Sequence, residues 1–434
     1  MTALPMPGSR AVLAPLLRYT LALGIRGVET VGKLGLYVLA ARTLGAHDAG
    51  LFFLCLTWIG LASTMARMGL DRAVTRHVAA ELAVGDVTRA RHALRSGLLW
   101  STVGGVAAAA LTAALAGPAD EMLFGQAGLA APLTVSAVVI IPQTMALMAG
   151  AVLAGLKRGL VAQLVQNALW PVLTLAGMLL GAVQLEPLLM VMGAALAVSA
   201  IGGFLVIAWE WRRLPGRRAG CDPAVTIPAP AHLPHLWRTA LPLLVVEVVQ
   251  VTLASAPVLA LGMVAEAGAV GAFSVASRIS MLVWVVIISV GTLVAPQFAE
   301  HHRRGEHDRL HALNRSARRA VALFGVPLVL LMMALPGTLL DMVGAGFDLA
   351  AGALVILAAG QLVNCLLPCQ DVLLAMTGHG RVLGRLNLLQ LGTCAVLAPV
   401  LIPALGMTGA AIVAALCVAQ GAIGTTIVAR FVLR

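Results

Sequence analysis

Apolar residues occur along this chain in long runs separated by short polar connections. Each run has about the length that an α-helix needs to cross the hydrocarbon core of a bilayer, roughly 20 residues. The pattern predicts twelve spans, at 18–41, 49–68, 95–116, 129–154, 160–182, 188–210, 238–262, 269–296, 320–341, 349–376, 383–402 and 407–430. A helix satisfies its own backbone hydrogen bonds, so we expect an all-α polytopic membrane protein.

Composition agrees with this interpretation. The chain is 60% hydrophobic and 11% charged, whereas a soluble domain carries about 25% charged residues. The first apolar run is long and leads directly into further spans, which indicates a retained helix and not a cleaved signal peptide. The net charge of +11 does not indicate a nucleic-acid partner, because the arginines lie in short connections between spans.

Basic and acidic residues alternate between the connections. Arginine and lysine follow the even-numbered spans, and acidic residues follow the odd-numbered ones, where Arg42 is the one arginine. The positive-inside rule then places both termini in the cytoplasm and the acidic connections outside. The outer connections are too short for an extracytoplasmic catalytic domain.

The two halves of the sequence resemble each other. Gly125 corresponds to Gly344 at a separation of 219 positions, and Gly50 and Gly271 each begin the second span of their half. Six spans per half is an even number, so the repeat is parallel and a cavity is expected between two lobes. The predicted division is an N-terminal six-helix lobe at 1–210, a cytoplasmic linker at 211–236 and a C-terminal six-helix lobe at 237–434.

Three charged residues lie on one face of the first span. Arg26, Glu29 and Lys33 follow helical spacing within an otherwise apolar run. A charge facing lipid costs roughly 2.5–3.5 kcal/mol on the mildest insertion scale, so this face is expected to meet protein or a water-filled cavity. Two interpretations stay open: the face lines a transport cavity, or Glu29 and Lys33 form an ion pair that only helps two helices to pack.

Further polar residues lie inside the other spans. Arginine pairs well with phosphate, so a surplus of cations in a cavity favours an anionic substrate, while the acids either partner the arginines or carry protons. The amides of the fifth and eleventh spans are expected to make hydrogen bonds between helices; they are Gln163, Gln166, Asn167, Asn387 and Gln390. The candidate substrate-binding residues are Arg26, Glu29, Lys33, Glu247, Gln250, Arg278, Gln361, Asn364 and Asp371.

No catalytic motif, metal site or cofactor site is predicted. The chain has no glycine-rich phosphate loop or nucleotide-binding domain, so transport would draw on an ion, potential or substrate gradient. His307 and His311 have metal-ligand spacing, but the neighbouring arginines favour a solvated face. The segments after the second and eighth spans are expected to be amphipathic helices that lie in the plane of the membrane surface, against anionic lipid.

Two long stretches resemble one known family. LGLYVLAARTLGAHDAGLFFLCLTWIGLASTMARMGLDRAVTRHVA and VGAFSVASRISMLVWVVIISVGTLVAPQFAEHHRRGEHDRLHALNRSARRA are similar to the polysaccharide-exporter branch of the multidrug/oligosaccharidyl-lipid/polysaccharide (MOP) exporter superfamily. The resemblance covers nearly the whole chain and implies a MATE-like fold of two six-helix lobes in the bacterial inner membrane.

The resemblance also implies a function. Members flip undecaprenyl-pyrophosphate-linked oligosaccharides, such as O-antigen, capsule or exopolysaccharide repeat units, to the outer leaflet. Related lipid II flippases carry cations on the first and eighth helices, a placement similar to that of Arg26, Lys33 and Arg278. Further expected partners are membrane lipids and the polymerase and glycosyltransferases of the same pathway. The alternative is a MATE-type drug/cation antiporter, which would depend on Glu29, Glu247 and Asp371.

Overall fold

The computed structural model describes residues 9–120, 128–213 and 236–432. All regular structure in these residues is helical. Eleven helical segments there are long and apolar enough to cross a membrane. The first, Gly24–Arg67, has 44 residues, and Gly45, with a φ of 75°, breaks it into two. The two parts correspond to the first and second predicted spans, so the predicted all-α polytopic architecture is confirmed in this part of the chain.

Among the described residues, the first half of the sequence forms α-helices and the π-helical segment η2. They are α1 (Ser9–Arg67), α2 (Leu70–Ala83), α3 (Val87–Pro118), α4 (Ala130–Gly155), α5 (Gly159–Gln163), the π-helical η2 (Leu164–Ala168), α6 (Leu169–Leu179) and α7 (Leu185–Arg213).

The second half begins with α8. Its helices are α8 (Leu236–Gly262), α9 (Ala267–Ser280), α10 (Leu282–Arg303), α11 (His307–Ala334), α12 (Pro336–Asp341), the 3₁₀ turn η3 (Asp348–Ala350), α13 (Ala351–Leu366), α14 (Gln370–Met376), α15 (Gly380–Leu405) and α16 (Met407–Val432). Most of the predicted linker, at 214–235, and the two chain ends at 1–8 and 433–434 lie outside the described residues.

The segment after the eighth span is not a separate in-plane helix, so the prediction was wrong for it. The segment after the second span does contain a separate helix, α2, whose in-plane orientation stays a prediction. α10 continues without a break to Arg303, and after a turn of three residues α11 runs unbroken from His307 to Ala334. After the second span, only the part that follows α2 belongs to a spanning helix, because α3 begins at Val87 and continues to Pro118. The amphipathic pattern therefore marks polar extensions of the spanning helices, whose apolar stripe packs on neighbouring helices.

By their contacts, the residues group into two compact units. The first comprises 1–37, 62–113 and 135–244, and the second comprises 38–61, 114–134 and 245–434. Each unit thus takes segments from both halves of the sequence, whereas the predicted lobes divide the chain in the linker. The division into lobes at 1–210 and 237–434 stays a prediction.

The core of the first unit joins α2 to α4 and to the start of α8. Leu70, Val74 and Val78 of α2 are fully buried against Met148 and Val152 of α4 and their neighbours. Gly69, at a φ of 71°, begins α2, and a Cβ there would lie 2.5 Å from Ala240 O. Only glycine permits both the left-handed conformation and this close approach of two backbones.

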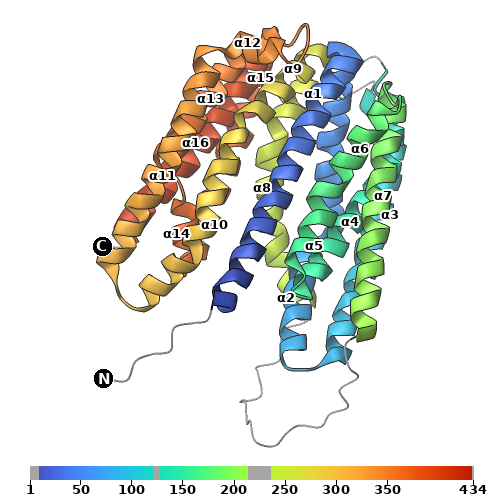
Figure 1. Ribbon diagram of the computed structural model, residues 1–434. Coiled ribbons are helices and arrows are strands. Elements are labelled where there is room, and N and C mark those ends of the chain that lie inside the picture. The colour runs from blue at the N-terminus through green and yellow to red at the C-terminus, as the bar shows by residue number, and fades with distance from the viewer. Residues whose placement is uncertain (1–8, 121–127, 214–235, 433–434) are drawn as a thin grey trace, which may run out of the picture. The chain divides into compact units, whose positions relative to one another are not determined.

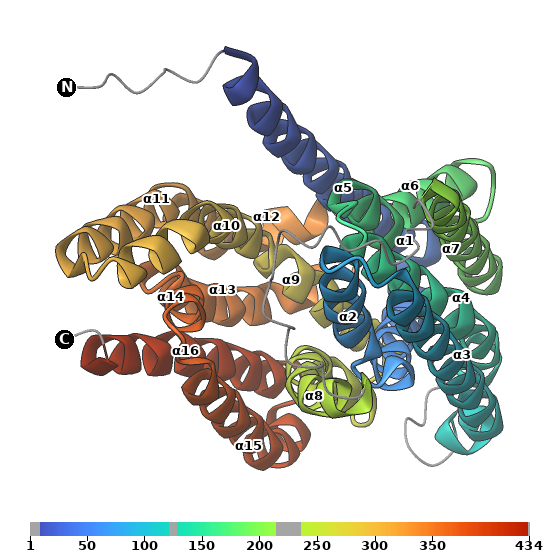
Figure 2. The ribbon, with the colours of Figure 1, turned by 90° about the horizontal axis from the view of Figure 1, so that it is seen from below.

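The second unit is a bundle in which α13 and α15 both pack against α16, and α11 packs against α10 and α13 (Figures 1 and 2). One core cluster includes Phe298 of α10, Leu310 of α11 and Leu374 of α14. Because Leu310 lies in the polar extension of α11, this extension is fixed in the bundle by buried apolar contacts.

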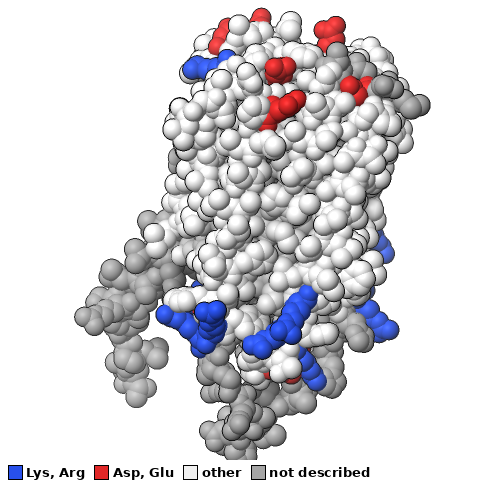
Figure 3. Space-filling view, turned by 90° about the vertical axis from the view of Figure 1, so that its right-hand side faces the viewer, with Lys and Arg blue, Asp and Glu red and all other residues white. Residues whose placement is uncertain are grey.

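Charged side chains are separated along the helices. On the face shown in Figure 3, lysine and arginine gather toward one end of the helices, and aspartate and glutamate gather toward the opposite end. The apolar surface between them has many exposed large hydrophobic side chains. This is the pattern of a protein surrounded by hydrocarbon at mid-height.

Candidate functional site

Two of the three charges in the first span form an ion pair. Lys33 Nζ donates to Glu29 Oε1 at 2.8 Å, and the two side chains retain 27% and 19% exposure. Lys33 Nζ also lies 6.0 Å from the ring centroid of Trp170 in α6, at the outer limit of a cation–π contact. The predicted pair is confirmed, and its partial exposure leaves Lys33 accessible to a ligand.

Glycines on α1 bring this pair against α6. A Cβ on Gly32 would lie 3.2 Å from Val172, and one on Gly35 would lie 3.5 Å from Leu175. Small residues allow the two backbones to approach closely inside a membrane protein. Because Lys33 directly follows Gly32, its side chain reaches Trp170, which lies on α6 together with Val172 and Leu175. Arg26 is half-buried one turn before Glu29, and its carbonyl accepts a hydrogen bond from Thr30.

Arg278 belongs to the second unit. It lies near the end of α9, half-buried, with its guanidinium carbon 5.0 Å from the ring centroid of Phe53. Phe53, on the second part of α1, is fully buried. A guanidinium group that lies over an aromatic ring keeps its charge, and its N–H donors point outward beyond the ring. An anion can accept hydrogen bonds from these donors.

The other candidates in the second unit fall into different environments. Glu247 is 7% exposed, whereas Gln250 one turn further along α8 is exposed. Gln361 is buried and accepts a hydrogen bond of 3.5 Å from Asn364. Of these four residues, only Gln361 and Asn364 are therefore brought together by a hydrogen bond.

The sequence pattern predicted that Asp371 shares a helix face with Gln361 and Asn364. This prediction was wrong. α13 ends at Leu366, and Cys369 takes a left-handed φ of 59° before α14 begins. Proline at 368 cannot continue the hydrogen bonds of the preceding helix. Asp371 thus lies exposed in the first turn of a new helix, where a carboxylate is favoured by the helix dipole.

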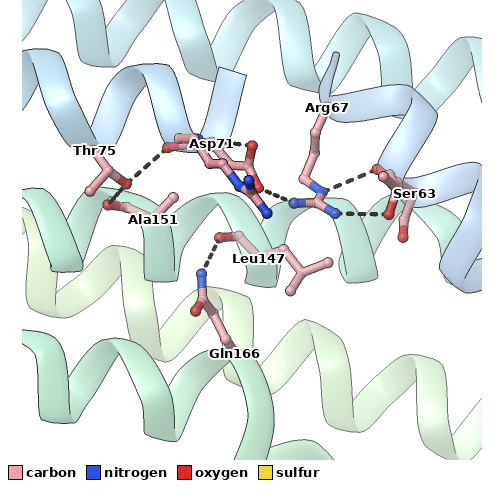
Figure 4. A network of polar contacts seen from close by, with 9 residues as sticks. Ser63, Arg67, Asp71, Thr75, Leu147, Ala151 and Gln166 are labelled. Carbon is pink, nitrogen blue, oxygen red and sulfur yellow. Dashed lines mark hydrogen bonds and ion pairs between the residues drawn. The ribbon is translucent and has the colours of Figure 1, made fainter. Parts of the chain in front are cut away.

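A buried ion pair at the end of α1 was not predicted as a site. Arg67 and Asp71 are 6% and 9% exposed and form an ion pair across the break between α1 and α2. Arg67 also donates to Ser63 O at 3.2 Å and to Thr64 Oγ1 at 3.0 Å (Figure 4). The sequence signal was the four-residue spacing of opposite charges on either side of Met68-Gly69.

This network continues to α4. Thr75 Oγ1 lies 2.9 Å from Asp71 O and 2.8 Å from Ala151 O (Figure 4). Both Met68 and Gly69 have positive φ values, of 51° and 71°. The two left-handed residues turn the chain between α1 and α2, and the buried polar groups fix that turn. A satisfied network of this kind specifies one geometry.

α2 also binds the beginning of α8. His77 Nε2 lies 3.2 Å from Thr239 Oγ1. Burial lowers the pKa of His77, against the opposing effect of Glu81 and with a further lowering by Arg76. Nearby, the Trp100 and Trp237 rings meet edge to face at 5.5 Å. These contacts lie within the first unit and fix the first turns of α8 in it.

One amide of the fifth span and one of the eleventh make interhelical hydrogen bonds, which confirms the prediction for Gln166 and Gln390. Gln166 Nε2 donates to Leu147 O at 2.9 Å (Figure 4), and Gln390 Nε2 donates to Cys417 O at 2.7 Å. Each amide fills the space over a glycine, Gly150 or Gly421, where a Cβ would collide with it. These glutamines therefore fasten neighbouring helices.

The first unit contains an apolar cavity of about 500 Å³ between α4 and α7. Its lining includes Pro142, Met145 and Phe204, and none of the nine candidate residues belongs to it. Among the described residues, no group of three histidine, cysteine, aspartate or glutamate side chains could hold a metal ion. His301 instead pairs with Glu306 at 2.8 Å.

Comparison with protein families identifies the family of the chain. The family described as "Polysaccharide biosynthesis protein" matches residues 23–302, which is more than half of the sequence. The chain belongs to this family. The match includes the whole first stretch on which the resemblance was based, together with α9 and most of α10. Comparison with curated proteins found no match.

Solved structures of the MOP superfamily share the fold. An inward-facing MATE-family multidrug resistance transporter is 15% identical, with a TM-score of 0.72 over 96% of this chain and 98% of that one. The lipid II flippase MurJ in an inward closed conformation is 12% identical, with a TM-score of 0.73 over 95% and 87%. A MOP transporter from Pyrococcus furiosus, reported to have a binding pocket of reverse polarity, is 15% identical, with a TM-score of 0.65 over 96% and 94%.

These comparisons confirm the predicted MATE-like MOP fold in a multi-pass membrane protein of the polysaccharide biosynthesis family. At these identities the structural likeness establishes the fold and leaves the substrate open. The nine candidate residues stay a prediction as a binding site. Three of them are in the first unit and six in the second.

Proposed function

We propose that this protein moves undecaprenyl-pyrophosphate-linked oligosaccharides, such as O-antigen, capsule or exopolysaccharide repeat units, from the cytoplasmic to the outer leaflet of the bacterial inner membrane. The match of residues 23–302 to the polysaccharide biosynthesis family carries this proposal. The shared fold with MurJ supports a lipid-linked cargo, because MurJ is described as a lipid II flippase. Alternating access between two lobes joined by the 211–236 linker is the proposed mechanism.

The cations of the first and eighth predicted spans supply the proposed recognition of the pyrophosphate. Lys33 is held by a carboxylate and remains partly exposed, so a phosphate oxygen can replace Glu29 as its partner. Arg278, on the face of Phe53, also offers guanidinium donors suited to an anionic group. An exchange of one anion for another keeps both Lys33 and the phosphate paired, and it leaves the partly exposed Glu29 carboxylate to be solvated by water in the cavity.

The proposal fixes an orientation and a set of partners. Both termini would lie in the cytoplasm, as the alternation of basic and acidic connections indicates. The cargo would come from glycosyltransferases on the cytoplasmic side and pass to a polysaccharide polymerase on the outer side. The lipid tail would stay in the bilayer throughout. The proposal includes no enzymatic step.

A MATE-type drug/cation antiporter is the second candidate. The observation that favours it is the burial of Glu247, which lies in α8 and is 7% exposed. Carboxylates inside membranes often carry protons or cations. The inward-facing MATE transporter shares the fold to a similar degree. A strain without the gene would then become sensitive to drugs and keep its surface glycan.

The experiment is a deletion complemented with variants. We expect the deletion strain to lose surface polysaccharide and the wild-type gene to restore it. Arg26→Ala and Arg278→Ala are then tested separately for export and membrane insertion. Arg304→Ala is the matched control, because that arginine is 60% exposed and pairs with Glu300 outside the candidate site. Normal surface polysaccharide in the deletion strain would overturn the proposed cargo. Normal export by well-inserted Arg26→Ala and Arg278→Ala would remove those residues from the site.

A further inference from the structure

The cavity between α4 and α7 opens onto the surface of the first unit. Its volume is about 500 Å³, and every residue that lines it is apolar. Val138, Met190 and Ile201 belong to the lining, and each is more than half exposed. An apolar cavity of about 150 Å³ already stays free of water and takes apolar ligands. Hydrocarbon chains are therefore the ligands that suit this cavity.

α4 and α7 end on the same side of the membrane. The two helices lie side by side (Figures 1 and 2). A Cβ on Gly193 would lie 3.1 Å from Val139 Cγ2, and one on Gly203 would lie 2.9 Å from Ala149 Cβ. These two contacts pair residues at the same separation in the sequence, so the helices run in the same direction. Their C-terminal ends therefore lie at one level.

Four cations lie at this end of the two helices, which is predicted to be cytoplasmic. Arg158, directly after α4, pairs with Glu210 of α7 at 2.8 Å, so an ion pair joins the two helix ends. Lys157, Arg212 and Arg213 are exposed and make no ion pair with another described residue. With Glu210 as the single acid among these five residues, the end of α4 and α7 carries a surplus of positive charge.

The stacking of Arg213 on Trp209 marks the level of the lipid headgroups. The Arg213 guanidinium carbon lies 3.4 Å from the ring centroid, and Trp209 is 48% exposed. Exposed tryptophans of membrane proteins gather at the boundary between hydrocarbon and water. A stacked guanidinium keeps its charge and its hydrogen-bond donors for a phosphate. The cations thus lie at the depth of the lipid phosphates.

The cations and the cavity lie along one line of α7. Arg212 follows Ile201 by about three helical turns, so the two residues share a face. Phe204 is the residue of the cavity lining on α7 that lies nearest to Arg212, at about 12 Å of helical rise. Half of the hydrocarbon core is about 15 Å thick. A chain attached to a phosphate at Arg212 is therefore long enough to enter the cavity.

We propose that the cavity and these cations form a binding site for an anionic phospholipid of the cytoplasmic leaflet, here named the α4–α7 lipid site. One acyl chain occupies the cavity, and the phosphate accepts hydrogen bonds from Lys157, Arg212 and Arg213. A resident phospholipid is favoured over the cargo because none of the nine candidate substrate-binding residues lines the cavity. The site would hold the ends of α4 and α7 together through their shared ligand.

Lipid binding to the purified full-length protein tests the headgroup contact. Native mass spectrometry measures the apparent affinities for phosphatidylglycerol, which is anionic, and phosphatidylcholine, which is not. A cation near a membrane surface changes the affinity for anionic lipid about fivefold, so Arg212→Gln/Arg213→Gln should weaken phosphatidylglycerol binding about 25-fold. Phosphatidylcholine binding should not change.

The matched control removes two cations from the end of another helix. Arg303→Gln/Arg304→Gln makes the same change of charge at the exposed end of α10. This variant should retain the phosphatidylglycerol affinity of the wild type. An equal loss in the two double variants would overturn the proposal, because it would show only a general attraction of lipid to a basic surface.

Filling the cavity tests the acyl-chain contact. Ala197 lines the cavity, and the neighbouring Val198 is exposed outside it. Ala197→Phe should weaken the binding of both phospholipids at least about fivefold, since it displaces several methylene groups. Val198→Phe is the control and should bind both normally. Ala194→Leu fills the same cavity with a smaller side chain and replaces Ala197→Phe if that variant melts early. Unchanged binding in a folded cavity-filled variant would overturn the proposal.

Undecaprenyl phosphate, added as a competitor in the same assay, separates the phospholipid from the lipid of the cargo. We expect it to bind no more tightly than phosphatidylglycerol. Tighter binding that Ala197→Phe abolishes would overturn the proposal and assign the cavity to the polyprenyl chain. The assay measures binding and not transport, so its result stands even if deletion of the gene leaves surface glycan normal.

Discussion

Lys33 and Glu29 form an ion pair one helical turn apart, with Nζ 2.8 Å from Oε1, on a face of α1 that packs against α6. The pair lowers the desolvation cost of a cation inside a membrane span, because Glu29 balances the charge of Lys33 before any ligand binds. In the proposed mechanism, the pyrophosphate competes with Glu29 for Lys33. The two residues therefore have unequal tasks, and their variants should behave differently.

Lys33→Gln should lower export strongly, and Glu29→Gln should not. A hydrogen bond to a charged group contributes about 1.5–3 kcal/mol, so loss of the ammonium should reduce the apparent affinity for cargo at least about tenfold. Glu29→Gln removes a competitor of the phosphate and should retain export or tighten binding. Surface polysaccharide at equal amounts of inserted protein measures both. Equal loss in the two variants would show that Glu29 itself takes part in the cycle.

Asp71→Ala should destabilise the protein by about 3–5 kcal/mol, because it leaves the Arg67 guanidinium buried without its carboxylate. Thermal unfolding in detergent measures the effect. Glu300→Ala is the matched control, since the Glu300–Arg304 pair has exposures of 52% and 60% and an exposed pair contributes about 0–1 kcal/mol. A double change of Arg67→Met with Asp71→Leu should recover much of the loss. Similar melting of Asp71→Ala and Glu300→Ala would refute the structural role of the buried pair.

Gly421→Ala should destabilise the contact of α15 with α16. The added methyl group would collide with the Gln390 amide, and overpacking of this kind costs about 1–3 kcal/mol. Gly392→Ala lies on α15 with nothing within 4 Å of its Cβ, so it should be neutral or stabilising by up to about 1 kcal/mol. The difference between their melting temperatures is the measurement. No difference would mean that Gln390 moves aside without loss.

Acidification should destabilise the contact between α2 and α8. Burial lowers the pKa of His77 in the folded protein, whereas in the unfolded chain it lies near 6.5. The unfolded chain therefore binds the proton more readily, and stability falls as the pH drops below about 7 toward the folded pKa. His77→Gln should melt with a weaker dependence on pH over this window. A dependence as steep as that of the wild type would assign the effect to other groups.

Periodicity and charge predicted the spans, the alternation of their connections and the Glu29–Lys33 pair, because each depends on residues close together in the chain. The bonds of Gln166 and Gln390 were also predicted, since an amide inside a membrane helix needs a partner. The break inside the tenth predicted span depends instead on backbone geometry. The left-handed residue Cys369 breaks the helix inside the predicted span 349–376, at a point that hydropathy does not register.

Two particular predictions were wrong for different reasons. Asp371 was assigned to the face of Gln361, but the break at Cys369 places it on a new helix. The segment of 303–319 was expected to lie in the membrane plane, whereas Leu310 and Ala317 anchor it in the bundle. Amphipathicity shows that a helix buries one face, and it does not distinguish lipid from protein as the partner.

Movement of the cargo between leaflets tests the central claim most directly. The purified protein is reconstituted into vesicles that carry a fluorescent undecaprenyl-pyrophosphate oligosaccharide, and the fraction of cargo accessible to an external reagent is followed over time. We expect protein-dependent exchange between leaflets that is slowed at least about tenfold by Lys33→Gln, in line with the loss of one charge-assisted bond. Exchange no faster than in protein-free vesicles, for wild-type protein that is correctly folded, would contradict the account.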